Sequence, residues 1–139
     1  MRSTLGAVLV VDDDPRSVDV LCRILARDGI EAVPATSGAD AVAIATTTTI
    51  DCLVLDVSMP GMDGFEVCEH LASDERTRAI PIILLTGRND DATRSTGMRL
   101  GVSEFLVKPV VKEELRARVR AQLRTRARVR EIDETLSRL

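Results

Sequence analysis

The sequence predicts an α/β fold in which five parallel strands form one sheet with helices on both faces. Five short apolar runs, rich in β-branched residues, alternate with five segments whose apolar residues recur at helical spacing. Such alternation is typical of parallel sheets, because each crossover helix returns the chain to the same edge of the sheet. The chain has 139 residues, which suits one domain with a little left over.

The first βα unit begins with a continuous apolar run at residues 7–11, as expected of a strand that is buried on both faces. Asp14 and Pro15 then supply an N-cap and a first-turn proline, so a helix begins there. Gly29 is placed to end this helix. Residues 30–35 form the second strand, and the proline within them assigns it to an edge of the sheet.

Ser37 and Asp40 resemble a capping box at the start of the second helix, which is expected to continue through Ala45. A polar, β-branched run at 46–49 then ends this helix. The later elements follow the same two patterns, with strands at 51–55, 80–85 and 102–107 and helices at 65–71, 90–100 and 111–139. The last helix is far longer than one layer of a small α/β domain needs.

Composition excludes several function classes. The chain has two Phe and no Tyr or Trp, which argues against base-stacking nucleic-acid binders and against aromatic-lined ligand clefts. Residues 111–139 hold nine Lys or Arg and five Asp or Glu, so a basic tail follows an acidic body. The tail arginines alternate along a helix, which spreads them around it. We interpret them as a solvated face and expect no direct nucleic-acid binding.

The cysteines and the N-terminus indicate where the protein acts. Cys22, Cys52 and Cys68 lack the spacing of a zinc or redox motif and lie among apolar neighbours, as expected of buried free thiols in a reducing cytosol. No signal-peptide pattern precedes the first strand, and no apolar run approaches the length of a membrane span. We therefore expect a cytoplasmic protein without a membrane contact. His70, the single histidine, is expected on a helix surface and not as a phosphodonor.

Polar residues follow four of the predicted strands. Asp12 and Asp13 come after the first strand, Asp56 after the third, Thr86 after the fourth and Lys108 after the fifth. Ligands of open parallel sheets bind beyond the carboxyl ends of the strands, so these groups are expected to share one small volume. Each alone has an ordinary explanation as a cap, a turn or a loop residue. Their joint placement predicts a site.

The chemistry of these groups favours phosphoryl transfer. Crowded carboxylates repel one another, and a hard divalent cation relieves the repulsion; oxygen ligands suit Mg²⁺. No His or Cys stands at the strand ends, which disfavours zinc and copper. Together with Mg²⁺, Lys108 can neutralise the charge that builds on a phosphoryl group during transfer. Asp56, alone at the end of a central strand, is the best candidate nucleophile.

Four segments make the sequence resemble the receiver domain of two-component response regulators, of the chemotaxis-regulator type. They are residues 8–15, residues 53–64, the pair Thr86–Gly87 and residues 105–109. The resemblance implies a flavodoxin-like, doubly wound fold with strand order 2-1-3-4-5. It also implies a receiver domain at residues 1–123, followed by a helical extension at 124–139.

The resemblance assigns roles residue by residue. Asp12 and Asp13 match the acidic pair, with Asp13 as the direct Mg²⁺ ligand. Asp56 matches the phosphoacceptor and a metal ligand, and Ser58 would contribute its backbone carbonyl. The family implies that a sensor histidine kinase or a phosphotransfer protein supplies the phosphoryl group. It also implies that the domain is a switch and not an enzyme.

The same resemblance assigns the switch. Thr86 matches the hydroxyl that follows the phosphoryl group, and Phe105 matches the switch aromatic. Lys108 would pair with the phosphoryl group, and the bond between Lys108 and Pro109 is expected to be cis. Two departures stand out: Phe105 replaces the frequent Tyr, so its outward state lacks a hydroxyl, and Gly87 replaces the frequent Ala or Ser.

The sequence leaves two other function classes to consider. A phosphatase or phosphotransferase resembling the haloacid-dehalogenase family would place its acidic pair at the spacing of Asp12 and Asp14. However, Asp14 leads into a proline-started helix, and the chain has no cap-domain insertion. A flavin-binding module of similar topology is weakened by the lack of aromatic residues and by acidic residues where a phosphate would bind.

The tail predicts a dimer. Its apolar residues fall at heptad spacing: Val129, Ile132, Leu136 and Leu139. The preceding seam positions, Gln122 and Thr125, are polar. Arg128 and Asp133 fall at the g and e positions of the heptad, where opposite charges on two parallel helices attract each other. We therefore expect a parallel homodimer through this helix and through the face of the fourth helix, fifth strand and fifth helix. It would lead to an absent output domain, such as a cyclase or a kinase; the alternative is a frayed or self-packed helix.

Overall fold

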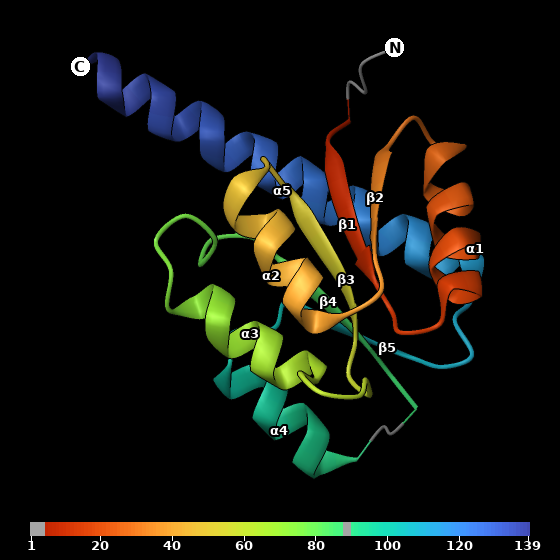
Figure 1. Ribbon diagram of the computed structural model, residues 1–139. Helices are drawn as coiled ribbons and strands as arrows, with labels where there is room; N and C mark the ends of the chain where they lie inside the picture. The colour runs from red at the N-terminus through yellow and green to blue at the C-terminus, as the bar shows by residue number, and fades with distance from the viewer. Residues whose placement is uncertain (1–4, 88–89) are drawn as a thin grey trace.

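The computed structural model describes residues 5–87 and 90–139 and contains one parallel sheet in the order β2-β1-β3-β4-β5 (Figure 1). The strands are β1 (Ala7–Val11), β2 (Glu31–Ala35), β3 (Cys52–Asp56), β4 (Ile82–Thr86) and β5 (Glu104–Val107). The helices are α1 (Pro15–Ala26), α2 (Gly38–Thr47), α3 (Gly64–Ala72), α4 (Asp91–Arg99) and α5 (Lys112–Arg138). The predicted doubly wound fold and its strand order are confirmed.

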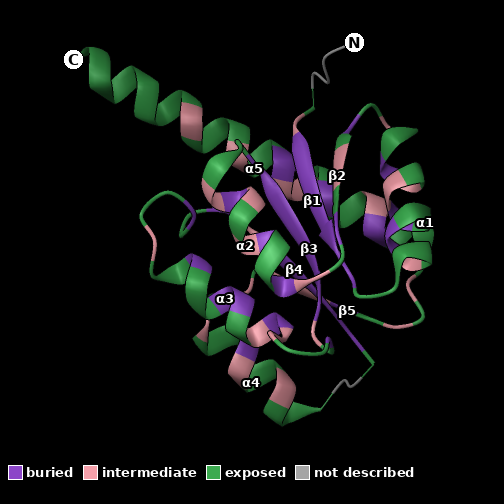
Figure 2. Ribbon diagram, viewed as in Figure 1, coloured by how far each residue is buried: buried purple, intermediate pink, exposed green. Residues whose placement is uncertain are grey.

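Two apolar cores cover the two faces of the sheet. Alternate strand residues such as Val8 and Val10 pack with α1 and α5, while Leu9 and Leu53 pack with α2 and α3. All residues of β1, β3 and β4 are buried, as Figure 2 shows in purple. The continuous apolar runs of the sequence thus correspond to strands that are covered on both sides.

Several predicted boundaries were wrong by one or two residues, and backbone hydrogen bonds explain two strand starts. β4 begins at Ile82 and not at residue 80, because the Ile80 N–H donates to Thr77 O in a preceding turn. β5 begins at Glu104 and not at residue 102, because the Val102 N–H closes the end of α4 by donating to Gly97 O.

The helix caps were predicted in part. Asp14 and Ser37 are N-caps as expected, but Ser37 makes only one half of the expected box, in which its Oγ accepts from the Asp40 N–H. A complete capping box, which the sequence analysis missed, joins Asp63 and Glu66 at the start of α3. α2 runs past Ala45 to Thr47, since the hydroxyls of its last threonines donate to carbonyls of the same helix.

The tail arginines are not simply a solvated face, contrary to the sequence interpretation. Arg116 forms a two-pronged ion pair with Asp28, with its Nε at 2.9 Å and its Nη2 at 2.8 Å from the carboxylate oxygens. Arg120 approaches the same carboxylate, and Arg118 pairs with Glu104 of β5 at 3.3 Å. The basic face of α5 therefore fixes the helix to acidic residues of the body.

A second set of contacts fixes α5 to the amino-terminal edge of the sheet. Asp51, which precedes β3, accepts from the Ala7 N–H at 2.8 Å and forms an ion pair with Arg130. Arg126 donates to the carbonyl of Ala79 before β4 at 3.2 Å. Beyond these contacts, residues 131–139 are all exposed, and the helix extends away from the body (Figure 1).

The remaining sequence expectations concern isolated residues. Cys52 and Cys68 are buried, and burial raises the pKa of each thiol to about 12. Cys22 is only half-buried, unlike the expectation. His70 is exposed on α3, as expected. In the described part of the chain, no helix is both long and apolar enough to span a membrane.

Candidate functional site

The carboxyl ends of β1 and β3 bring three carboxylates together, because the two strands are neighbours in the sheet. Asp12, Asp13 and Asp56 each offer an oxygen, and these oxygens lie within 4.8 Å of one another. Asp12 and Asp56 are buried, with 4% and 3% of their surface exposed, whereas Asp13 is open to solvent. Two buried acids and one exposed acid thus form one acidic cluster.

Lys108 places a positive charge beside the acidic cluster. Its Nζ lies 3.0 Å from Asp56 Oδ1 and 3.7 Å from Asp12 Oδ2. The Lys108 N–H donates to Thr86 O at 2.8 Å, which fixes the end of β5 to the end of β4. The Lys108–Pro109 bond is cis, as the resemblance implied.

The cluster has the charge distribution of a cation site. Burial raises the pKa of the Asp12 carboxyl; the neighbouring Asp56 charge adds to this effect, while the hydrogen bond from the Asp14 backbone and the Lys108 charge oppose it. Three carboxylates face one lysine, so one ammonium leaves uncompensated negative charge. An all-oxygen donor set with excess negative charge fits a hard divalent cation such as Mg²⁺.

The loop after β3 lies close to the acceptor strand. The Ser58 N–H donates to Asp56 Oδ1 at 3.3 Å, so the amide of this residue contacts the site; the role of its carbonyl as a metal ligand stays a prediction. A Cβ at Gly64 would lie 2.5 Å from Asp56 O, and only glycine permits this close approach. The predicted helix began one residue later, at residue 65; the position of Gly64 at the start of α3 sets the distance between helix and strand.

Thr86 is buried at the end of β4, next to the strand that carries Asp56. The residue after it, Gly87, is exposed, and a Cβ built there would meet no atom of the described residues within 4 Å. The strand ends place Thr86, Asp56 and Lys108 at one edge of the sheet, as predicted.

Phe105 is half-buried, and its ring lies against α4. A Cβ at Gly97 would lie 2.5 Å from Phe105 Cζ and 2.7 Å from Cε1, so the missing side chain of Gly97 makes a slot for the ring. The Arg94 guanidinium carbon lies 5.5 Å from the ring centre, in cation–π geometry. Neither α4 residue was predicted from the sequence, although a glycine inside a predicted helix is a signal of such a close approach.

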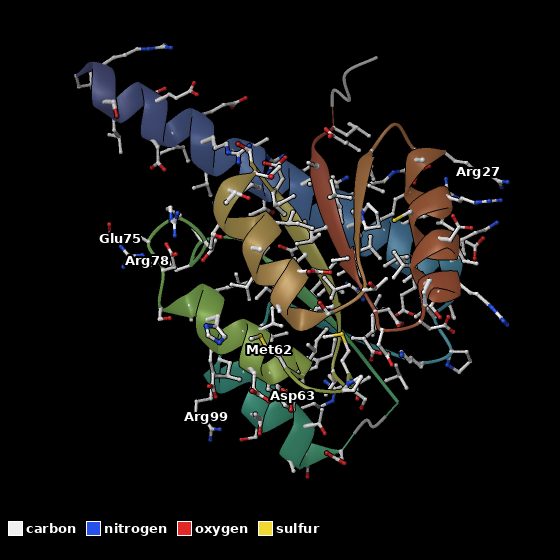
Figure 3. All side chains as sticks on the ribbon, in the orientation of Figure 1. Arg27, Met62, Asp63, Glu75, Arg78 and Arg99 are labelled. Carbon is white, nitrogen blue, oxygen red and sulfur yellow. The ribbon has the colours of Figure 1, made fainter. Side chains whose placement is uncertain are left out.

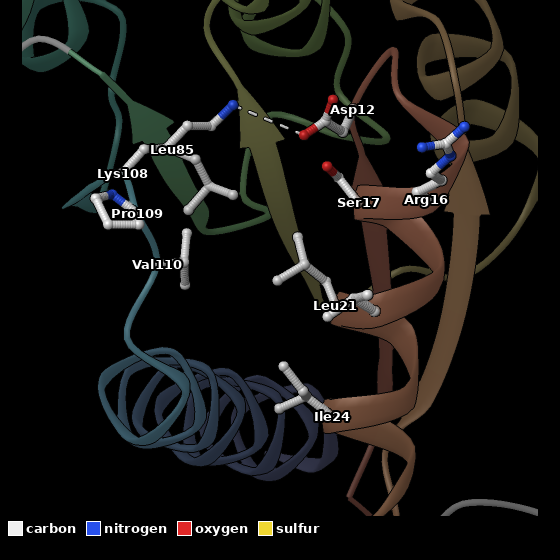
Figure 4. A pocket seen from close by; sticks show the side chains of 10 residues that line it. Asp12, Arg16, Ser17, Leu21, Ile24, Leu85, Lys108, Pro109 and Val110 are labelled. Atoms are coloured by element: carbon white, nitrogen blue, oxygen red, sulfur yellow. Dashed lines mark ion pairs between the residues drawn. The ribbon is translucent and has the colours of Figure 1, made fainter.

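An apolar groove of about 390 Å³ opens beside the acidic cluster, between α1 and the segment after β5 (Figure 4). Leu21 and Ile24 of α1 face Pro109 and Val110 across it, while Asp12 and Lys108 stand at one end. Val20, which also lines the groove, is 55% exposed. The groove offers apolar contact area directly next to the charged site.

Comparisons with known proteins agree with this geometry. A family model described as response regulator receiver domain matches residues 8–120. The chain is 41% identical over 117 residues to the transcriptional regulatory protein AfsQ1 of Streptomyces coelicolor, covering 84% of this chain and 51% of that protein. The chain therefore spans about half the length of this relative.

Two solved structures are similar along nearly their whole length. The receiver domain of the sensor histidine kinase PA1611 from Pseudomonas aeruginosa, with a magnesium ion in its active-site cleft, is 25% identical with a TM-score of 0.78, over 85% of this chain and 97% of that one. A structure of adenylate cyclase from Rhodopirellula baltica is 28% identical with a TM-score of 0.86, over 96% of this chain and 98% of that one. The chain belongs to the response regulator receiver domain family, the signalling domains of two-component systems.

Proposed function

We propose that Asp56 accepts a phosphoryl group from a sensor histidine kinase or a phosphotransfer protein, and that the phosphorylated domain changes a protein-interaction surface. One observation carries this proposal: Lys108 Nζ lies 3.0 Å from the buried Asp56 carboxylate. The oxygen of Asp56 thus has a cation beside it that would also lie beside an attached phosphoryl group.

The acidic cluster would hold Mg²⁺ through Asp12, Asp13 and Asp56, with the Ser58 backbone carbonyl as a further ligand. When bound, the metal supplies positive charge that offsets the repulsion between the acceptor carboxylate and an incoming phosphoryl group. Asp13 is the most exposed of the three carboxylates and would meet the ion from the solvent side.

The phosphoryl transfer needs no oxidant or reductant. An oxygen of the Asp56 carboxylate forms a bond to phosphorus while the phosphorus–nitrogen bond of the donor phosphohistidine breaks, and the electron pair stays on the imidazole nitrogen. The Lys108 ammonium pairs with the negative phosphoryl oxygens of the resulting acyl phosphate.

Phosphorylation would then act through Thr86 and Phe105. The Thr86 hydroxyl would move inward to donate a charge-assisted hydrogen bond to a phosphoryl oxygen. Phe105 would turn from its slot beside Gly97 into the space that Thr86 vacates. The surface that changes is the face of α4, β5 and α5, the two-state element of the switch.

The groove between α1 and Pro109 is where the donor protein would dock. A phosphohistidine must reach Asp56, so its carrier must contact the surface that borders the acidic cluster. The groove borders that cluster and exposes apolar side chains, including Val20. Replacing Val20 with Asp is expected to slow transfer from a protein donor while leaving transfer from a small acyl phosphate unchanged.

We retain the division into a receiver at residues 1–123 and a helical extension at 124–139 that leads to an output domain. The extension supports a parallel dimer because its heptad residues are exposed on a helix that leaves the body: Val129, Ile132, Leu136 and Leu139. The face of α4, β5 and α5 would add to the contact, and it exposes Met98 and Val107.

Sedimentation of the full chain and of a version ending at Gln122 tests the dimer. The full chain should associate with rising concentration, and the shortened chain should be monomeric without a phosphoryl mimic. Two monomeric proteins at every concentration, with or without the mimic, would contradict the dimer. In this role the domain signals in the cytoplasm, turns over no substrate and contacts neither nucleic acid nor membrane itself.

The acceptor is tested by intact-mass spectrometry after incubation with a small acyl phosphate and Mg²⁺. One phosphoryl group should be added to the parent and to the matched control Asp74→Asn, whose carboxylate is outside the acidic cluster and forms an ion pair with Arg76. Asp56→Asn should show no addition. Labelling that survives Asp56→Asn would refute the assignment.

A further inference from the structure

A polar hollow of about 360 Å³ lies at the amino-terminal edge of the sheet, at the opposite end from the acidic cluster. The end of α2 and the segment 46–50 form one side of it, and Arg76 and Ile80 from the segment before β4 form another. Arg126 and Arg130 of α5 complete the lining. Segments distant in the sequence therefore surround one hollow.

The lining is strongly basic. Three arginines line the hollow, and no described acidic residue is among its lining residues. Arg76 pairs with Asp74, and Arg130 pairs with Asp51, so two of the three arginines have acidic partners outside the lining. Among the described residues, Arg126 has no carboxylate within ion-pair distance, and it is the source of the excess positive charge.

Arg126 is also incompletely hydrogen-bonded. Its Nη1 donates to Ala79 O, but its Nε is buried and has no partner in the described structure. Burial lowers the pKa of this guanidinium, and the neighbouring Arg130 charge lowers it further. A desolvated cation beside a second cation is costly unless an anion joins them.

The geometry points to a binding site for the phosphate group of a small soluble molecule, held by Arg126, Arg130 and Arg76. Guanidinium groups match phosphate through paired N–H donors, and three arginines line a hollow large enough for such a group. Thr48 and Thr49 also line the hollow, so their hydroxyls are further potential donors. This site is separate from Asp56, and the inference does not depend on phosphoryl transfer there.

The C-terminus of α2 disfavours anion binding in this hollow, but Arg76 reduces the effect. The C-terminus of α2 points its last carbonyls toward this region, and a helix C-terminus repels negative charge. Arg76 Nη1 donates to the Thr46 carbonyl at 3.2 Å and so covers part of that negative end. The charge of Arg126, which has no ion-pair partner among the described residues, then remains at the hollow.

The test is a titration of the full chain, without Mg²⁺, followed by amide NMR. Inorganic phosphate should shift the amides of Thr48, Thr49 and Ile50, in a set distinct from the amides near Thr86. A parallel titration with adenosine monophosphate distinguishes the sources of the phosphate group. Tighter binding of the nucleotide identifies a nucleotide site, and equal binding identifies a site for free phosphate.

Two variants locate the binding. Arg126→Gln should weaken the affinity about tenfold or more, since a charge-assisted contact is lost. Arg124→Gln removes the same charge from the exposed side of the same helix and should leave the affinity within about twofold. If Arg126→Gln does not fold, Arg76→Gln serves instead and should weaken binding several-fold. The inference is overturned if residues 48–50 show no shift, or if the folded variant binds as tightly as the parent.

Discussion

Replacing Gly97 with Ala tests whether the slot on α4 holds the ring of Phe105. The new methyl group would lie 2.5 Å from Phe105 Cζ, well inside van der Waals contact, and the nearest atoms belong to a rigid ring packed against the core. Either the ring leaves the slot or α4 moves outward. Both responses remove contacts that the parent has.

Two effects of this substitution oppose each other. Alanine inside a helix stabilises it by about 1 kcal/mol relative to glycine. Overpacking against a ring costs about 1–3 kcal/mol. In the parent background, Gly97→Ala should therefore lower the free energy of unfolding by about 0–2 kcal/mol. In a Phe105→Ala background the clash is absent, and Gly97→Ala should raise the free energy of unfolding by about 1 kcal/mol.

Urea unfolding of the four proteins in this cycle gives the coupling energy between Gly97 and Phe105, expected at about 1–3 kcal/mol. Ser95→Ala, at an exposed position of the same helix, is the matched control and should act alike in both backgrounds. The chain has two Phe and no Tyr or Trp, so the Phe105 ring signals are readily resolved by NMR and should shift in Gly97→Ala. Equal stabilisation by Gly97→Ala in both backgrounds would show that the ring does not occupy the slot.

Three further predictions concern single groups. Asp13→Ala should weaken Mg²⁺ binding at least about tenfold in a calorimetric titration, because it removes one carboxylate from the cluster, whereas Asp14→Ala should leave it unchanged. Hydrogen bonds from Arg116 lower the pKa of the Asp28 carboxyl below its usual value of 3.8. The ionised carboxylate therefore stabilises the folded protein fully above that value, and this stabilisation is lost as the pH falls. The difference in the free energy of unfolding between the parent and Asp28→Asn should accordingly shrink below about pH 4. With thiol pKa values of about 12, Cys52 and Cys68 should resist alkylation at neutral pH until urea unfolds the chain, as mass spectrometry would show.

The sequence predicted the acidic cluster well because the rule behind it is topological. Once the strands are parallel, their carboxyl ends share an edge, so Asp12, Asp56 and Lys108 meet whatever the side chains between them are. The strand order came from the resemblance, since alternation alone fixes no order. The predicted strand boundaries were wrong where a local turn, such as the one in which the Ile80 N–H donates to Thr77 O, competes with the sheet for a backbone donor.

Contacts between distant segments could not be predicted in the same way. The pairing of Arg116 with Asp28 joins residues 88 positions apart, and a pattern confined to one helix assigns these arginines to solvent. The slot at Gly97 depends on where the Phe105 ring lies, which no local spacing specifies. Only the packed fold determines which charges and rings meet.

The anchoring of α5 ends at Arg130, and the rest of the helix is an overhang. The helix has 27 residues and is about 40 Å long, and Arg130 contacts the body eight residues before its end at Arg138. That overhang is about 12 Å long, so a tilt of about 10° at Arg130 would displace the tip by about 2 Å. In a helix continuing past Leu139 the displacement would grow in proportion to length, so the anchor would act as a fulcrum.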